Sequence, residues 1–270
     1  MRLNTMESNL ETDAPKRWVG ASPEGLASAM VLAAGRGERM RPLTDTAPKP
    51  MLKVHGKPLM QWHMEALAKA GHPDQLINTA WLGPQIEAHF GLNPDLPNGG
   101  RVRLRYSHEG KEFGYALETA GGIVRALPFL APVFWVVAGD IYAPQFDFAP
   151  AIAKEFVRSD KLAHIWLVPN PAHNPKGDFG LSSEGLALNL PKTATLFTFS
   201  TLALYKKEFF AAALTGMPEG NPQGKAAPLA PLLRAAMDRG LVSASLYTGA
   251  WTDVGTPERL RDLNQSPATP

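Results

Sequence analysis

The chain has no cysteine, no long apolar run and little net charge, and each absence excludes a class of protein. Without cysteine among its 270 residues, it has no disulfide bond, no thiolate chemistry and no cysteine-ligated zinc. No apolar run reaches the roughly 18 residues that a membrane-spanning helix needs. The 27 basic and 25 acidic residues leave a net charge of only +2, which argues against binding nucleic acid through bulk charge. We therefore expect no nucleic-acid or membrane partner, and the absence of cysteine fits a cytoplasmic protein.

The N-terminal segment differs in composition from the rest of the chain. It is polar and mixed in charge, and it lacks the continuous apolar region of a signal peptide. We interpret residues 1–27 as a flexible extension, with a functional arm as the alternative. Residues 28–266 then form a single domain near the upper size limit of one hydrophobic core, and the 44% hydrophobic content is enough to build it.

Strand-like and helix-like segments alternate along this domain. Strands are predicted at residues 28–33, 74–82, 101–107, 133–140, 162–168 and 241–247, with two or three more within 178–202. Helices are predicted at residues 58–71, 83–91, 120–129 (with Thr119 as its cap), 206–214, 226–239 and 256–264. This order predicts an α/β fold, a Rossmann-like three-layer α/β/α sandwich with a mostly parallel central sheet.

A basic, glycine-containing segment, LAAGRGERMRPLTDTAPKPM at residues 32–51, directly follows the first predicted strand. Ligands of α/β sheets bind beyond the carboxyl ends of the strands. Gly35 and Gly37 allow backbone N–H groups to converge on an anion, while three arginines and Lys49 add positive charge suited to phosphate oxygens. The segment is neither a P-loop nor a dinucleotide fingerprint, because Met40 stands where the third glycine is needed. The Gly-x-Gly element taken alone favours a solvated basic loop over a phosphate site.

The full segment and its continuation resemble the signature of the sugar-phosphate nucleotidyltransferases. The matching parts are Leu-Ala-Ala-Gly-x-Gly, Arg-Met-Arg-Pro-Leu-Thr, Pro-Lys-Pro and Gly-Lys-Pro-Leu, and the likeness covers most of residues 29–264. Many members have threonine at the position of Glu38. The segment Gly-Glu-Arg-Met-Arg-Pro-Leu-Thr, with this glutamate, is similar to that of the N-acetylmuramate α-1-phosphate uridylyltransferase branch, which makes UDP-N-acetylmuramic acid in peptidoglycan recycling. Further segments that resemble this branch are INTAWLGPQIEAHFG, ETAGGI, NPKGDFGL and WTDVGTPERL. The resemblance implies the GT-A-like nucleotidyltransferase fold.

Two aspartates are candidates for a metal site. Asp140 ends the strongest central strand, and Asp253 follows another apolar run. Mg²⁺ prefers oxygen ligands and often uses one or two carboxylates together with substrate phosphates. The resemblance implies that both aspartates bind Mg²⁺, whereas the residues alone are also compatible with turn or cap positions.

The resemblance also implies a reaction and roles for individual residues. A sugar-1-phosphate oxygen attacks the α-phosphorus of UTP and pyrophosphate leaves. Arg39 offsets charge on the pyrophosphate, and Lys49 bridges the α-phosphate and the sugar phosphate; an exposed Lys49 between two prolines is the alternative. The implied catalytic residues are Arg39, Lys49, Asp140 and Asp253. The implied nucleotide-binding residues are Ala34, Gly35, Gly37, Glu38, Arg39, Lys49, Glu118, Gly121 and Gly122. The implied sugar-side contacts are Asn78, Ala138 and Asp178. The alternatives are that Asn78 only satisfies local backbone groups and that Asp178 is an ordinary loop aspartate.

Two departures from the branch bear on which sugar is used. Ala138 stands where the branch has asparagine, and no glycine follows Ser200 in the segment FTFSTLALY. Sister enzymes therefore stay open as alternatives, using mannose-1-phosphate with GTP or glucose-1-phosphate with dTTP. A non-catalytic nucleotide-sugar sensor on the same fold and a lipid- or choline-directed cytidylyltransferase are further alternatives. The base preference and the oligomeric state are left open.

Overall fold

The computed structural model describes residues 26–190 and 195–267. The predicted extension, residues 1–27, therefore lies almost entirely outside the described residues. The first strand, β1 (Ala27–Ala33), starts one residue earlier than the sequence predicted.

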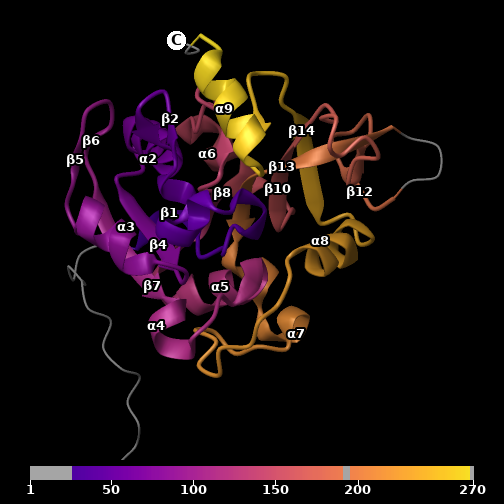
Figure 1. The fold of residues 1–270 in the computed structure, drawn as a ribbon. Helices are drawn as coiled ribbons and strands as arrows, with labels where there is room; N and C mark the ends of the chain where they lie inside the picture. Colours follow the sequence, from indigo (N-terminus) through magenta and orange to yellow (C-terminus); the bar gives the residue numbers. More distant parts are fainter. Residues whose placement is uncertain (1–25, 191–194, 268–270) are drawn as a thin grey trace, which may run out of the picture.

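One large sheet forms the centre of the molecule (Figure 1). Its further strands are β4 (Asp74–Thr79), β7 (Arg103–His108), β8 (Leu130–Ala138), β10 (Ala163–Val168), β11 (Phe179–Leu181), β12 (Ala187–Leu188), β13 (Leu196–Lys206) and β14 (Val242–Leu246). The main order is β14-β10-β13-β8-β1-β4-β7, and β11 and β12 extend the sheet from one end of β13. β8, β1, β4 and β7 are mutually parallel, while β13 runs antiparallel to its neighbours β8 and β10. The predicted mostly parallel sheet is confirmed.

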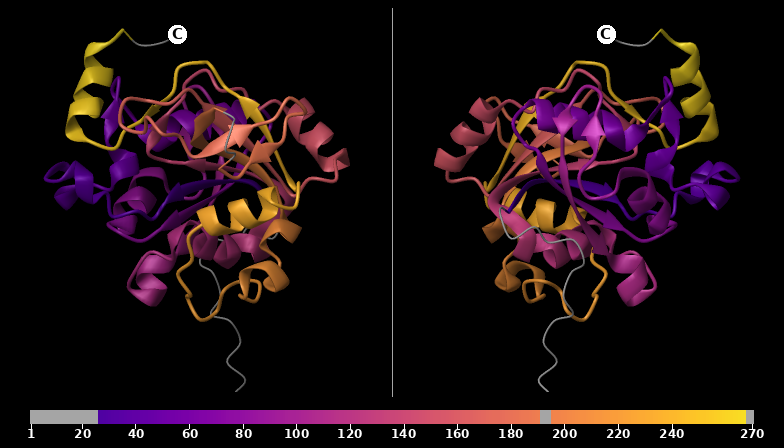
Figure 2. Two further views of the ribbon diagram at one scale, coloured as in Figure 1. Left: turned by 90° about the vertical axis from the view of Figure 1, so that its right-hand side faces the viewer. Right: turned by 90° about the vertical axis from the view of Figure 1, so that its left-hand side faces the viewer.

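Helices cover both faces of this sheet (Figure 2). One face carries α5 (Glu118–Ala126), the 3-10 turn η4 (Lys207–Phe210) and α8 (Ala230–Met237). The other carries α2 (Leu59–Lys69), α3 (Gly83–Phe90) and α6 (Pro150–Arg158). Alternation along β1 explains the two layers, because Met30 packs into the first cluster whereas Ala29 and Val31 pack into the second. The three-layer sandwich is therefore as predicted.

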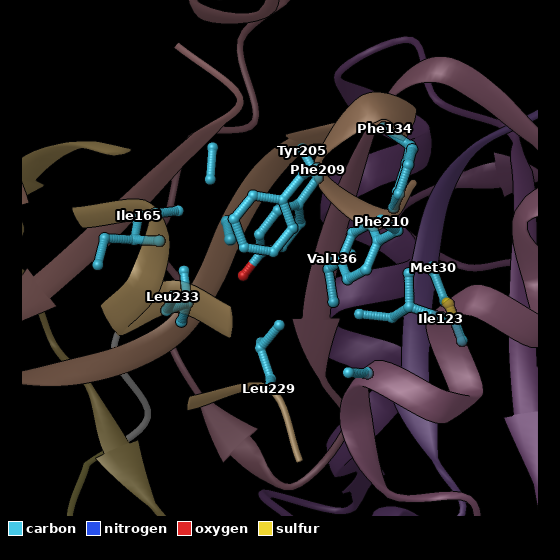
Figure 3. Packing of buried hydrophobic residues seen from close by; sticks show 14 of the residues in the cluster. Met30, Ile123, Phe134, Val136, Ile165, Tyr205, Phe209, Phe210, Leu229 and Leu233 are labelled. Carbon is cyan, nitrogen blue, oxygen red and sulfur yellow. The ribbon is translucent and has the colours of Figure 1, made fainter. Parts of the chain in front are cut away.

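Four aromatic side chains cluster in the core between the sheet, α5 and η4. Phe134, Tyr205, Phe209 and Phe210 lie together there, each at most 2% exposed (Figure 3). Tyr205 also lines the cavity described below.

Smaller elements connect these strands and helices and flank the sheet at both of its edges. They are the helices α1 (Leu43–Thr46), α4 (Glu109–Phe113), α7 (Ala212–Thr215) and α9 (Pro257–Gln265), the turns η1 (Glu38–Met40), η2 (Lys49–Met51) and η3 (Leu127–Phe129), and the short strands β2 (Lys53–Val54), β3 (Lys57–Pro58), β5 (Asp95–Leu96), β6 (Gly100–Arg101), β9 (Ile141–Tyr142) and β15 (Thr252–Asp253). Among the described residues, no helix is long and apolar enough to cross a bilayer.

Two predicted helices differ from the structure. The helix expected at 206–214 is instead η4 and α7, separated at Ala211 by extended backbone. Phe209 and Phe210 are both buried, so tertiary packing overrides the helix propensity of the following alanines. The helix expected from residue 226 begins at Ala230, where Pro231 occupies an early helical position that needs no N–H.

The predicted cap at Thr119 is also wrong. The N-cap of α5 is Leu117, and its side chain makes no capping bond. The N–H groups of Ala120 and Gly121 instead donate to the carbonyl oxygen of Ala227, at 2.9 and 3.1 Å. A loop more than a hundred residues away in sequence thus satisfies this helix start, which local spacing cannot predict.

Candidate active site

The candidate site lies where the strand order of the sheet reverses. After β1 the chain builds β4 and β7 on one side, then crosses to place β8 on the other. Such a switch point opens a crevice beyond the carboxyl ends of the two central strands. A cavity of about 700 Å³ lies at this edge. The predicted residues that line it are Ala34, Gly35, Lys49, Asn78, Glu118, Ala138, Asp140 and Asp178.

Lys49 lies between the two predicted metal aspartates. Its Nζ is 2.6 Å from Oδ2 of Asp140 and 4.0 Å from Oδ1 of Asp253, and the residue is only 7% exposed. The three come together because β15 pairs with β9, which places Asp253 opposite Ile141. The N–H of Val254 also donates to the carbonyl oxygen of Asp140, at 3.1 Å. The exposed-lysine alternative for Lys49 is therefore wrong.

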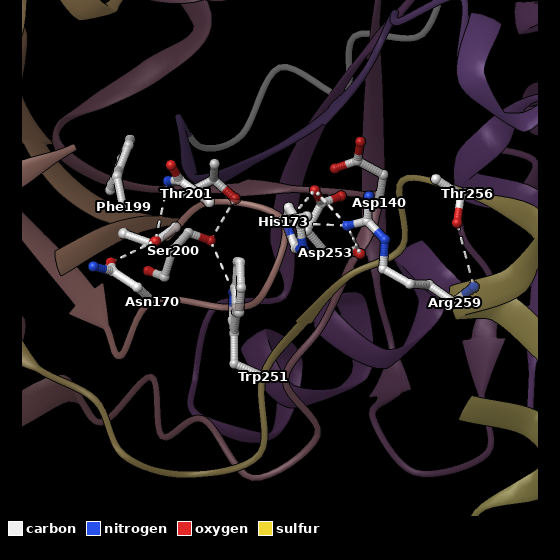
Figure 4. Close-up of polar contacts among 12 residues, drawn as sticks. Asp140, Asn170, His173, Phe199, Ser200, Thr201, Trp251, Asp253, Thr256 and Arg259 are labelled. Atoms are coloured by element: carbon white, nitrogen blue, oxygen red, sulfur yellow. Dashed lines mark hydrogen bonds and ion pairs between the residues drawn. The ribbon is translucent and has the colours of Figure 1, made fainter. Parts of the chain in front are cut away.

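Asp253 is held by two residues that the sequence analysis did not single out. Arg259 of α9 donates to its Oδ2 at 3.0 Å and to its carbonyl oxygen at 2.7 Å. His173 Nε2 lies 3.4 Å from the same Oδ2. Figure 4 shows both side chains converging on Asp253 beside Asp140. Arg259 belongs to the motif WTDVGTPERL, whereas no spacing in the sequence pointed to His173.

The donor set around Lys49 fits a divalent cation. Asp140 and Asp253 supply hard carboxylate oxygens, and the lysine ammonium between them shows that this position accepts positive charge. The described residues hold no group of three or more His, Cys, Asp or Glu side chains suited to a metal. Two carboxylates therefore suit an ion that completes its coordination with substrate phosphates and water rather than an all-protein cage.

The arginines of the basic segment do not all face the cavity. The guanidinium of Arg36 stacks on Trp81, 3.5 Å from the ring centroid, and donates to the carbonyl oxygen of Thr44. Arg41 pairs with Asp45 at 2.8 Å. These two arginines stabilise the conformation of the loop. Their guanidinium groups contact Trp81, Thr44 and Asp45 rather than the cavity.

The middle of the loop is built around a left-handed glycine. Gly37 has φ 67°, and a Cβ on it would lie 3.0 Å from Thr44 Cγ2 and 3.1 Å from Lys49 Cβ. Glycine is therefore needed here both for conformation and for the close approach of Lys49. Glu38 and Arg39 follow in η1, are exposed to solvent and do not line the cavity.

Asn78 connects three elements at the cavity wall. Its Oδ1 accepts from the N–H of Ala33 at 2.9 Å, and its Nδ2 donates to Oε1 of Glu109 at 2.8 Å. Oε2 of Glu109 accepts from the N–H of Leu117 at 2.7 Å, and burial raises the pKa of the Glu109 carboxyl. The amide of Asn78 is thus used to join the ends of β1 and β4 to the start of α5. No motif in the sequence pointed to Glu109.

Gly121 and Gly122 pack against the protein itself. A Cβ on Gly121 would lie 2.5 Å from the carbonyl oxygen of Lys225, and one on Gly122 would lie 2.5 Å from Oε1 of Glu109. Glu118, by contrast, is exposed and lines the cavity, with φ 56°. Nucleotide contact by any of the three stays a prediction.

The far end of the cavity is formed by β11, β13 and α8. Asp178 lies here, and its Oδ2 accepts from the N–H of Phe199 at 2.9 Å. Thr201 stands where the sequence lacks an expected glycine, and it has φ 65°. Its hydroxyl donates to the carbonyl oxygen of Ser200, which Trp251 Nε1 also contacts at 3.1 Å (Figure 4). Ala138 completes this side of the lining.

Comparison with known proteins decides the family. The sequence family described as Nucleotidyl transferase matches residues 28–269. The chain belongs to this family. The predicted relationship to the sugar-phosphate nucleotidyltransferases is confirmed, and the family is one whose enzymes generally use a divalent metal ion.

Individual relatives agree with this assignment. This nucleotidyl transferase is 43% identical over 236 residues to an N-acetylmuramate alpha-1-phosphate uridylyltransferase of Neisseria meningitidis serogroup B, covering 87% of this chain and 95% of the relative. A protein of the same name from Caulobacter vibrioides is 30% identical, with 85% and 92% covered. The crystal structure of a putative glucose-1-phosphate thymidylyltransferase from Bacillus anthracis has a TM-score of 0.69 and 19% identity, covering 88% of this chain and 93% of that one. This last likeness shows a shared fold.

Proposed function

We propose that the protein is a Mg²⁺-dependent uridylyltransferase that makes UDP-N-acetylmuramic acid and pyrophosphate from UTP and N-acetylmuramic acid 1-phosphate. The observation that carries the proposal is the 43% identity to a relative of this activity over 95% of its length. The reaction places the enzyme in peptidoglycan recycling in the cytoplasm, with small-molecule substrates and no nucleic-acid or membrane partner.

Charge neutralisation and alignment are the main demands of this reaction. The sugar-phosphate oxygen attacks the α-phosphorus of UTP in line with the departing pyrophosphate. Lys49 bridges the α-phosphate and the sugar phosphate, so that two anions can approach each other. Arg39, exposed on η1, offsets the charge of the pyrophosphate. Asp140 and Asp253 hold Mg²⁺, which when bound supplies positive charge to the phosphate oxygens.

Other residues position the two substrates. Arg259 and His173 orient the Asp253 carboxylate by direct contacts. Asn78 holds the end of β1, so its effect on the nucleotide and sugar is through backbone placement. Asp178 and Ala138 face the sugar. The remaining nucleotide contacts are assigned to Ala34, Gly35, Gly37, Glu38, Glu118, Gly121 and Gly122.

The test is pyrophosphate release with Mg²⁺, measured over a grid of nucleotides and sugars. UTP, dTTP, GTP and CTP are each paired with the 1-phosphates of N-acetylmuramic acid, N-acetylglucosamine, glucose and mannose. We expect the strongest signal from UTP with the muramic sugar. A different dominant pair would move the enzyme to a sister specificity, as the Ala138 and Thr201 positions allow. If the folded protein releases no pyrophosphate with any of these pairs, a non-catalytic nucleotide-sugar sensor is favoured.

A further inference from the structure

The cavity has a second basic side chain besides Lys49. Among the described residues that line it, Lys49 and Arg234 are the basic ones. Arg234 belongs to α8 and lies at the end of the cavity formed by Asp178 and Phe179. No motif in the sequence pointed to it, and the proposed reaction does not use it.

Neutral groups hold the Arg234 guanidinium in place. Nη1 donates to Oδ1 of Asn189 at 2.8 Å, and Nη2 lies 3.5 Å from the carbonyl oxygen of Asp178. The Cζ atom lies 4.9 Å from the ring centroid of Phe179, within cation–π range. The amide of Asn189 donates to both carboxylate oxygens of Asp238, at 3.0 and 3.1 Å. Asn189 therefore lies between the side chains of Arg234 and Asp238 and contacts both.

The positive charge of Arg234 is left without a counterion in the part of the chain that the structure describes. Its recorded partners are an amide, a carbonyl oxygen and an aromatic ring. Asp178 is the nearby acidic residue of the lining, but its carboxylate accepts from Phe199 N and Asn174 Nδ2. Lys49, in contrast, has Asp140 and Asp253 around it. A half-buried guanidinium held by neutral groups is prepared for an anionic ligand.

The substrate of the proposed function carries two anionic groups. One is the 1-phosphate, which goes to Lys49 and the metal site. The other is the carboxylate of the lactyl ether on the sugar ring, which N-acetylglucosamine lacks. Ala138 offers the sugar no hydrogen bond, so discrimination between the two sugars must come from another residue.

We propose that Arg234 binds the lactyl carboxylate and thereby selects the muramic sugar. This inference rests on the proposed function and extends it to a specificity-determining residue. The planar guanidinium matches a carboxylate in bidentate geometry. The Asn189 amide, the Asp178 carbonyl oxygen and the Phe179 ring hold it in position without neutralising its charge.

The experiment compares three sugar 1-phosphates with UTP and Mg²⁺. They are those of N-acetylmuramic acid, of its lactyl amide, which keeps the shape but removes the charge, and of N-acetylglucosamine. The enzymes are the wild type, Arg234→Gln, Arg234→Lys and Arg239→Gln, an exposed arginine just beyond α8 that serves as the matched control. Thermal melting verifies that each variant is folded.

We expect the wild type to lose roughly 10- to 100-fold in kcat/KM when the carboxylate becomes an amide, as for a charge-assisted hydrogen bond. In Arg234→Gln the acid and the amide should be used about equally, with the KM for UTP unchanged. Arg234→Lys should keep part of the preference because it keeps the charge, and Arg239→Gln should behave as the wild type.

Other outcomes separate the two proposals. If Arg234→Gln slows all three sugars by the same factor, Arg234 has a structural role and the inference is overturned, while the proposed function stands. If the wild type itself prefers N-acetylglucosamine 1-phosphate, the proposed function fails and the inference fails with it. If Arg234→Gln does not fold, equal use of acid and amide by the wild type overturns the inference, and a lower preference in Arg234→Lys supports it.

Discussion

At the scale of single residues, the site depends on a buried lysine that is stabilised by two carboxylates. Lys49 Nζ lies 2.6 Å from Asp140 Oδ2, and the Asp140 side chain is 35% exposed. Under the proposed function, we expect Asp140 to exchange its lysine partner for Mg²⁺ when substrate phosphates arrive, because those phosphates also attract the lysine. Asparagine has the same shape as aspartate but carries no negative charge to attract a metal ion.

Asp140→Asn tests this residue directly. We expect turnover with Mg²⁺ to fall by roughly 10³-fold or more, since a charge that stabilises the transition state is lost. The protein should stay folded because the amide keeps the shape, with a lower melting temperature because the buried Lys49 loses the nearer of its two carboxylates. Asp160→Asn, at an exposed position with 81% of its side chain accessible, is the control and should keep full activity. Substantial Mg²⁺-dependent activity in Asp140→Asn would remove Asp140 from the metal site.

Thr201 is a second residue whose local conformation can be tested. A β-branched residue at φ 65° is strained by about 1–3 kcal/mol, whereas glycine adopts this conformation freely. The added entropy of glycine in the unfolded chain costs about 0.5–1 kcal/mol, so the relief of strain should win. We expect Thr201→Gly to raise the free energy of unfolding by about 1 kcal/mol in urea denaturation.

The control for Thr201 lies on the same strand. Thr198 is buried, and its backbone is not among the residues with positive φ. Thr198→Gly should therefore lower the stability. If Thr201→Gly lowers it to the same extent, strain at Thr201 is absent.

At the scale of elements, α5 is fitted closely against the loop that precedes α8. The Ala227 carbonyl oxygen accepts from the first N–H groups of α5, and Gly121 leaves no room for a side chain next to Lys225. The start of α5 and the loop before α8 therefore form one unit, and this unit also supports the cavity wall at Glu118 and Pro228.

Two glycine-to-alanine changes should separate packing from binding. In Gly121→Ala the new Cβ lies 2.5 Å from the Lys225 carbonyl oxygen. The overpacking cost of about 1–3 kcal/mol should exceed the gain of about 1 kcal/mol in helix propensity, so we expect a lower melting temperature. In Gly35→Ala the Cβ meets no atom within 4 Å, so the fold should be unchanged while the KM for UTP rises several-fold. The reverse pattern, with Gly35→Ala unstable and Gly121→Ala neutral, would contradict this assignment.

At the scale of the whole molecule, buried histidines make the fold sensitive to mild acid. Burial lowers the pKa of His63 and of His164 from the ordinary value of 6.5 to about 4. His63 is 1% exposed and hydrogen-bonds to the carbonyl oxygen of Ile141, while His164 lies against Trp166. Both pack within the protein as neutral rings.

The pH dependence follows from the sign of these shifts. Because the folded pKa lies below the unfolded one, the unfolded chain binds more protons between pH 6.5 and about 4. Stability should therefore fall as the pH is lowered through this window, by up to roughly 1 kcal/mol per pH unit for each histidine. Urea denaturation at several pH values between about 7.5 and 5 measures this slope.

His164→Gln should flatten the slope because it removes one of the histidines whose pKa is lowered by burial. His89→Gln, at an exposed position on α3, is the matched control and should leave the slope as in the wild type. Equal slopes in all three proteins would show that His164 is not protonated preferentially in the unfolded state.

The sequence by itself determined the features that depend on neighbours along the chain. Periodicity placed β1, β4 and β8 within a few residues, and the order of strands and helices predicted the layered parallel sheet. The long motif after β1 indicated the family without any structure. Where helices started or broke, as at α8 and η4, local patterns were less reliable, because packing of distant segments overrides propensity.

Only the tertiary structure decided which side chains act together. It turned Lys49 toward the cavity while tying Arg36 to Trp81, and it brought Asp253 beside Asp140 through the pairing of β15 with β9. It also placed Arg234 in the cavity wall without a counterion in the described part of the chain. The physical reason is the same in each case. These contacts join residues far apart in sequence, and their geometry follows from strand register and helix packing, which no local spacing encodes.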